Sequence, residues 1–130
     1  MIQKTATTLS FLTGLAMIFL GARFLLFPEQ GETGYGIHFN EQGDYSFHYI
    51  KGIRDVFSGI VICLLVLARQ SKALGITMLA GTIIPLVDLL IVVSKDDNGL
   101  VAALPHSVAI LVCSICGIVL LNSNALKQSV

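Results

Sequence analysis

The sequence predicts an all-α protein: one integral membrane domain, residues 1–130, folded as an antiparallel bundle of four transmembrane helices. Composition is the first observation, because the chain is 55% hydrophobic and 12% charged, with a mean hydropathy of +0.83, whereas soluble domains are about 25% charged. The second is that four apolar stretches are each long enough to cross about 30 Å of hydrocarbon as a helix. Lipid-exposed strands would leave their backbone groups without partners.

The predicted helices cover residues 8–27, 45–69, 73–93 and 101–121. The first could instead be a secretory signal, because Lys4 precedes an apolar core and LGA precedes Arg23. Its apolar run continues to Phe27, past the point where a signal would be cut, which favours a spanning helix. In the third helix, Pro85 lacks an amide hydrogen, so the freed carbonyl of Gly81 predicts a kink or a bound water.

The links between the predicted helices differ in length. Short polar turns, ARQSKA and SKDDNG, make the second, third and fourth helices antiparallel neighbours. A Gly-rich segment from Pro28 to about Asp44 is predicted as an ordered outer loop. Aromatic and polar residues alternate on both sides of EQGD, which is typical of a hairpin; alternatively, Asp44 caps a helix that begins at Tyr45. We expect a loop or strand-like stretch up to Gly43, followed by helix.

The distribution of charge predicts the orientation of the bundle. Arg69 and Lys72 lie in a turn without acids, Lys4 and Lys127 lie on the same side, and all eight acids lie on the other side. The positive-inside rule therefore predicts that both termini are cytoplasmic, in a bacterial inner membrane or its equivalent.

Ionisable residues are predicted to form a layer at one depth, close to the outer face. At 1.5 Å per residue from the inner helix ends, Arg23, the Arg54–Asp55 pair, Asp88 and His106 all lie about 21–24 Å deep. Their formal charges balance, with two arginines against two aspartates and His106 adjustable. Charges at such a depth are costly unless they are paired or hydrated, which makes them functional candidates.

Helical periodicity predicts that these groups face the interior of the bundle, next to small residues that allow close packing. The predicted pocket residues are Arg23, His48, Lys51, Arg54, Asp55, Ser58, Asp88 and His106. Arg23 and Arg54 would hold an anionic or polar group, and Asp55 would orient them. Asp88 and His106 are the candidate catalytic or proton-exchanging pair. The alternative interpretation is that two structural ion pairs fix the helix register.

Other motifs are interpreted as structural. Cys113 and Cys116 form a C-x-x-C in the fourth helix, as in quinone-linked disulfide oxidoreductases, but Cys63 is the only other cysteine and nothing can relay electrons outward. We therefore expect buried, apolar cysteines. Small multidrug transporters rely on an acid in their first helix, which here has only Arg23. No spacing indicates a zinc site, no cofactor is expected, and His38, like His48, is predicted to be solvated or hydrogen-bonded.

Two short motifs carry a resemblance to known proteins. GARFLLFPE closes the first helix and KGIRDVFSGI opens the second. They resemble small four-helix membrane proteins called DoxX-like and, more narrowly, a family of about this length known only as a domain of unknown function. The resemblance implies a four-helix bundle in a membrane. Some DoxX-type proteins are associated with quinol- or sulfur-oxidising complexes, but no residue here is assigned that role.

Three functions remain open at this point. The leading hypothesis is a charge-balanced pocket near the outer face that binds a small polar, anionic or lipid-like ligand, with or without catalysis. The second is a structural or assembly subunit of a larger membrane complex. The third is a small proton-coupled transporter that acts as a dimer. The expected partners are membrane lipid, such a ligand and a second copy or complex partner, and the zero net charge gives no indication of nucleic acid.

Overall fold

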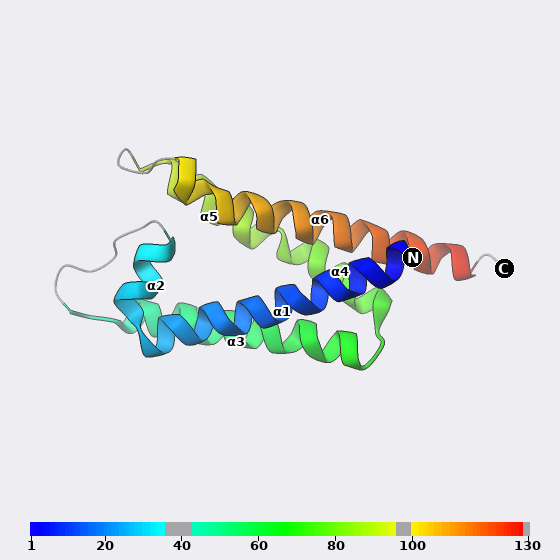
Figure 1. The fold of residues 1–130 in the computed structure, drawn as a ribbon, viewed down its shortest axis with the longest axis horizontal. Coiled ribbons are helices and arrows are strands. Elements are labelled where there is room, and N and C mark those ends of the chain that lie inside the picture. Colours follow the sequence, from blue (N-terminus) through cyan, green and yellow to red (C-terminus); the bar gives the residue numbers. More distant parts are fainter. Residues whose placement is uncertain (36–42, 96–99, 129–130) are drawn as a thin grey trace.

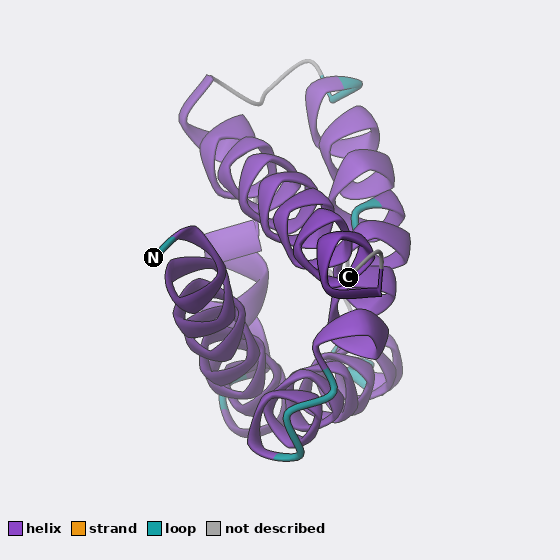
Figure 2. Ribbon diagram, turned by 90° about the vertical axis from the view of Figure 1, so that its right-hand side faces the viewer, coloured by secondary structure: helices purple, strands orange, loops and turns teal. Residues whose placement is uncertain are grey.

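The structure, a computed structural model, describes residues 1–35, 43–95 and 100–128. The helices are α1 (Ile2–Leu26), α2 (Pro28–Tyr35), α3 (Ser46–Leu67), α4 (Ser71–Gly81), α5 (Ile83–Val93) and α6 (Leu100–Gln128). Figure 2 shows no strand among the described residues, so the predicted all-α class is confirmed.

Three segments of the described chain are long and apolar enough to cross a membrane: Ile2–Leu26, Ser71–Val93 and Val101–Ser123. The predicted fourth, α3, is not among them, because Lys51, Arg54 and Asp55 interrupt its apolar sequence. Large apolar side chains are exposed along every long helix, among them Leu12, Phe19, Leu64, Leu90 and Leu111. So much exposed apolar surface is typical of a protein that lies in lipid.

The helices form two groups that meet at one end. α1 packs along α3, while α4 and α5 pack along α6. The two groups converge at the end that holds both chain termini, and they diverge toward the opposite end, where α2 lies against α1 and α3 (Figure 1).

Glycines on facing helices bring α1 and α3 into backbone contact. Gly14 of α1 lies against Gly59 of α3, and Gly21 lies against Gly52. A Cβ atom added to Gly59 would lie 2.4 Å from the Gly14 carbonyl oxygen, and one added to Gly21 would lie 2.5 Å from the Gly52 carbonyl oxygen. Both distances are far below van der Waals contact, so only glycine permits this approach. Each helix spaces its glycines seven residues apart, which keeps them on one face of an antiparallel pair.

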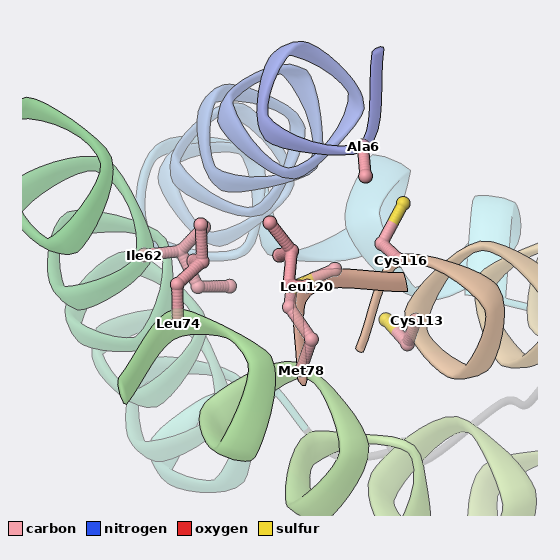
Figure 3. Close-up of a cluster of buried hydrophobic side chains, with 7 residues drawn as sticks. All are labelled: Ala6, Ile62, Leu74, Met78, Cys113, Cys116 and Leu120. Atoms are coloured by element: carbon pink, nitrogen blue, oxygen red, sulfur yellow. The ribbon is translucent and has the colours of Figure 1, made fainter. Parts of the chain in front are cut away.

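A buried apolar cluster joins the two groups at the converged end (Figure 3). It consists of Ala6, Ile62, Leu74, Met78, Cys113, Cys116 and Leu120, from α1, α3, α4 and α6. Leu120 is fully buried and Leu74 and Met78 are 1% exposed. The predicted burial of the three cysteines is confirmed, and all three are free thiols. The cluster fixes the angle between the two groups at the end where they meet.

The predicted break in the third transmembrane segment is confirmed. α4 ends at Gly81 and α5 begins at Ile83, with Thr82 between them. Pro85 cannot donate to the Gly81 carbonyl one turn before it. At the break the Thr82 amide donates to the Leu79 carbonyl at 3.2 Å, and the Thr82 hydroxyl donates to the Met78 carbonyl at 3.1 Å.

The segment from Pro28 to Tyr35 is the helix α2, so the prediction of a loop there is wrong. Pro28 is its first residue, a favoured place for proline, and Glu29 lies in its first turn, where a negative charge is stabilised. Gly31 packs against the Phe24 ring, because an added Cβ would lie 3.2 Å from the ring carbons. This glycine therefore serves close packing and not chain flexibility.

The start of α3 excludes the hairpin alternative. The residues that would form the second strand are helical from Ser46 onward, one residue later than the predicted start. Asp44 accepts hydrogen bonds from the Ser46 hydroxyl at 2.6 Å and the Ser46 amide at 2.9 Å, which lowers the pKa of its carboxyl group. The rest of the predicted hairpin and outer loop, residues 36–42 with His38, lies outside the described residues.

Candidate functional site

A cavity of about 610 Å³ lies between the two groups of helices, on the side where they diverge. Every helix from α1 to α6 contributes to its wall. Most of the wall is apolar, with side chains that include Met17, Leu20, Val61, Ile76 and Ile84. Polar and ionisable side chains gather toward the end near α2. The cavity is therefore amphipathic, with an apolar body and a polar end.

Six of the predicted pocket residues line this cavity: Arg23, Lys51, Asp55, Ser58, Asp88 and His106. The small residues predicted to share their faces, such as Gly81 and Ala109, line it as well. The two remaining predicted residues, Arg54 and His48, do not line the cavity.

Arg54 is exposed and does not line the cavity. Its neighbours Ile50 and Ile53 are also largely exposed and do not line the cavity. The predicted balance of charges, which counted Arg54, therefore does not describe this cavity. Lys51 lines it instead, and the Lys51 ammonium lies 3.0 Å from the Asp55 carboxylate one turn along the helix. Helical periodicity placed both cations on one face, and the observed packing of α3 against α1 turns only Lys51 inward.

Lys51 is held among aromatic rings as well as by its carboxylate. Its ammonium lies 4.4 Å from the centre of the Tyr35 ring and 5.2 Å from that of Phe24. Cation–π contacts of this kind stabilise a cation that is partly removed from water. Together with Asp55 they fix the Lys51 side chain at the polar end of the cavity.

Tyr35 connects the two groups of helices across the cavity. Its phenol is hydrogen-bonded with Asp88 of α5, and its ring meets that of His106 edge to face at 4.9 Å. The ring nitrogen Nε2 of His106 lies 3.4 Å from the Tyr35 carbonyl oxygen. Burial raises the pKa of the Tyr35 phenol, and the hydrogen bond with Asp88 and the charges of Asp88 and Asp55 raise it further. The phenol therefore stays protonated and can donate to Asp88.

Arg23 has a structural contact and spare donors. Its Nη2 atom donates to the Gln30 carbonyl oxygen of α2 at 2.9 Å. A guanidinium carries five N–H donors in all. Arg23 therefore holds α2 in place and also lines the cavity.

His48 belongs to the attachment of α2 and not to the cavity. It is fully buried, and its Nε2 atom lies 2.7 Å from a carboxylate oxygen of Glu32, which is 5% exposed. The rings of Phe24 and Tyr45 flank it, and the Tyr45 hydroxyl donates to Glu29. This donation raises the pKa of the Tyr45 phenol. The contacts of Glu32 and Glu29 hold α2 against the start of α3. Because Tyr35 is the last residue of α2, these contacts also fix its position at the cavity.

Glu32 and Tyr35 are the residues that the sequence did not reveal. Both lie in the segment predicted as a loop, where neither hydropathy nor helical spacing gave them a partner. Proline followed by an acid at Pro28–Glu29 is the signal for a helix start that could have placed them on one short helix. In the part of the chain that the structure describes, no three His, Cys, Asp or Glu side chains lie close enough to hold a metal ion.

The chain matches a family model over residues 14–120, from the middle of α1 to Leu120 of α6. No curated protein and no solved structure matches it. The broader likeness to DoxX-like proteins thus finds no support among these comparisons. The narrower resemblance is confirmed, and since the match covers most of its length, the protein belongs to the family described as a domain of unknown function (DUF4267).

Proposed function

We propose that the protein crosses the membrane four times, with α3 as the fourth transmembrane segment. α3 has 22 residues, which gives a length of about 33 Å. It touches α1 at two glycine contacts, Gly14 with Gly59 and Gly21 with Gly52. A membrane that α1 crosses must therefore also surround α3. Two of its three charges, Lys51 and Asp55, neutralise each other beside the cavity. The third, Arg54, is long enough to extend toward the membrane surface.

Both termini lie on the cytoplasmic side in this proposal. They share the converged end of the bundle, which also carries Lys4, Arg69 and Lys72 and no acid among its described residues (Figure 1). A reporter that is active only in the cytoplasm should therefore be active when fused to either terminus. Activity of a periplasmic reporter at those positions would reverse the orientation.

Within the membrane, the protein binds an amphiphile, a lipid-like molecule with an apolar body and a polar head, in the cavity between the two groups of helices. The amphipathic cavity is the observation that carries this proposal. Its volume falls in the range of about 300–1,000 Å³ that is usual for ligand sites, and those sites are also mostly apolar with a few convergent polar groups. The apolar body would lie among the side chains near Met17 and Ile76, and the polar head would meet Lys51, Tyr35 and Asp88.

A purely structural role explains the polar residues less well. Charges that serve only to join helices need no space between them, and here they border an open cavity. Asp88 interacts with the phenol of Tyr35, and His106 contacts the ring and the backbone carbonyl of the same residue, so the two groups predicted to exchange protons both lie against Tyr35.

Cys113 is a built-in reporter for occupancy, because it lines the cavity while Cys63 and Cys116 do not. In a variant with Cys63→Ala and Cys116→Ala, a small membrane-permeable thiol reagent should modify Cys113 slowly when a single-chain amphiphile is present and faster after exhaustive delipidation. We expect a change of about tenfold, as for any site whose access requires ligand departure. Intact mass spectrometry measures the rate.

The control places the single cysteine on the lipid-facing side of the same helix, by Ile115→Cys with Cys113→Ala added. Ile115 is 57% exposed. Its modification should not depend on the amphiphile. Equal protection at both positions, or protection at neither, would contradict binding inside the cavity.

A further inference from the structure

We propose that the polar head of the bound amphiphile carries no net charge. This inference rests on the proposed function and narrows it to one ligand class: a single hydrocarbon chain that ends in a neutral group able both to donate and to accept hydrogen bonds, such as a glyceryl ester or an alcohol. It derives from the charges that border the cavity and from the hydrogen bonds those groups already make.

The formal charges along the cavity wall cancel when His106 is counted as neutral. Arg23 and Lys51 contribute two positive charges, and Asp55 and Asp88 contribute two negative ones. Lys51 and Asp55 already form an ion pair at 3.0 Å. The exposed Arg54 lies outside this set. A head with a full charge would therefore bring an unmatched charge into a mostly apolar space.

An unmatched charge in such a space is penalised, because the water that solvated it is lost and no counter-charge replaces the water. A neutral head avoids this penalty. The wall carries charges of both signs, including one ion pair, and not a group of cations alone. Sites built for phosphates or carboxylates differ, because several cations converge there.

The wall also supplies both kinds of hydrogen-bonding partner that a neutral head requires. Arg23 gives one N–H to the Gln30 carbonyl and has others that can donate. The carboxylates of Asp55 and Asp88 can accept, since each has two oxygens. A hydroxyl can accept from Arg23 while it donates to Asp88. A carboxylate head could use only the first of these partners, and an ammonium head only the second.

The size of the cavity favours one chain. Its volume of about 610 Å³ is in the middle of the range for drug-sized ligands. The apolar lining runs from the polar end down to Met78 and Cys113, beside the cluster that joins the two groups of helices. Since the lining at this end belongs to the buried cluster, it suits a single chain that enters lengthwise.

The test compares three probes of one chain length on the delipidated protein in a neutral detergent: a monoacylglycerol, the free fatty acid and the alkyl amine. Protection of Cys113 gives each affinity. We expect the monoacylglycerol to bind about tenfold more tightly than either charged probe, a difference of the size that one unmatched charge produces at a partly buried site. Tightest binding of the fatty acid or the amine would overturn the inference.

Charge variants make the same test from the opposite direction. Asp88→Asn leaves one excess positive charge and keeps an acceptor for Tyr35, so the fatty acid should gain affinity relative to the amine. Arg23→Gln leaves one excess negative charge and should favour the amine. Arg54→Gln is the matched control, because it removes the same charge outside the cavity, and the order of the probes should not change. The same shift in Arg54→Gln as in Arg23→Gln would overturn the inference.

Failure of the two proposals can be told apart. If none of the three probes protects Cys113, the proposed function fails and the question of head charge does not arise. If a charged probe protects it best, amphiphile binding stands and only the neutral head is wrong.

Discussion

Replacement of Gly59 by alanine is expected to separate α1 from α3 and to lower the free energy of unfolding by about 2–3 kcal/mol. The added methyl group would lie 2.4 Å from the Gly14 carbonyl oxygen and 2.8 Å from the backbone nitrogen of Ile18. Neither atom can move away, because each belongs to the backbone of a helix. The two helices must therefore part over several turns. Thermal unfolding of the purified protein in detergent, followed by circular dichroism, measures the loss.

Gly81→Ala is the matched control, since it adds the same methyl group to another helical glycine. A Cβ atom at Gly81 would meet nothing within 4 Å. Alanine is also the better helix former, so we expect unchanged stability or a gain of up to about 1 kcal/mol. Equal losses in the two variants would show that the facing glycines of α1 and α3 do not limit their approach.

Removal of the Glu32 carboxylate is the second change with a large expected effect. Glu32→Ala should lower the free energy of unfolding by about 3 kcal/mol, because it leaves His48 without this partner in a fully buried position. We expect α2 to detach first, since this pair lies between α2 and α3. Hydrogen exchange measured by mass spectrometry should show faster exchange of the α2 amides, and the cavity should then lose its cover at Tyr35.

Two further variants test whether the loss of stability comes from the broken Glu32–His48 pair or from any substitution on α2. Glu32→Leu combined with His48→Leu removes both polar groups and should lose less stability than Glu32→Ala alone, as is common when a buried pair is replaced by apolar residues. Glu29→Gln removes the charge of an exposed carboxylate on the same helix but keeps an oxygen that can accept from the Tyr45 hydroxyl, so it should cost little. If the double variant were the least stable of the three, the buried pair would stabilise the fold more than apolar side chains at the same two positions do. That result would contradict the expectation.

The sequence predicted the parts of this fold that depend on hydropathy and proline. The apolar runs placed the long helices, and Pro85 placed the break between α4 and α5. The first and last residues of the helices were predicted less well. α1 begins at Ile2 and α6 continues to Gln128, because apolar composition marks the part of a helix that suits lipid and says little about polar turns at its ends.

The polar site was predicted only in part, for two physical reasons. A helix face is wide, so spacing alone could not decide which of Lys51 and Arg54 turns inward; the glycine contact at Gly52 decides it by fixing how α3 lies on α1. The second reason is α2. Its glycines and proline indicated a loop, although Gly31 is there for close packing against Phe24.

The order of the helices has a consequence for how the protein is made. The chain through α3 forms one group, and the chain from α4 onward forms the other, so each group is a continuous half of the polypeptide. Within the first half, Lys51 already has Asp55, Arg23 has the Gln30 carbonyl and His48 has Glu32. All of these partners therefore belong to the first half, and the pairs can form during insertion, before the ribosome has completed the second half. Asp88 and His106 reach Tyr35 only afterwards, and their docking is the step that completes the cavity.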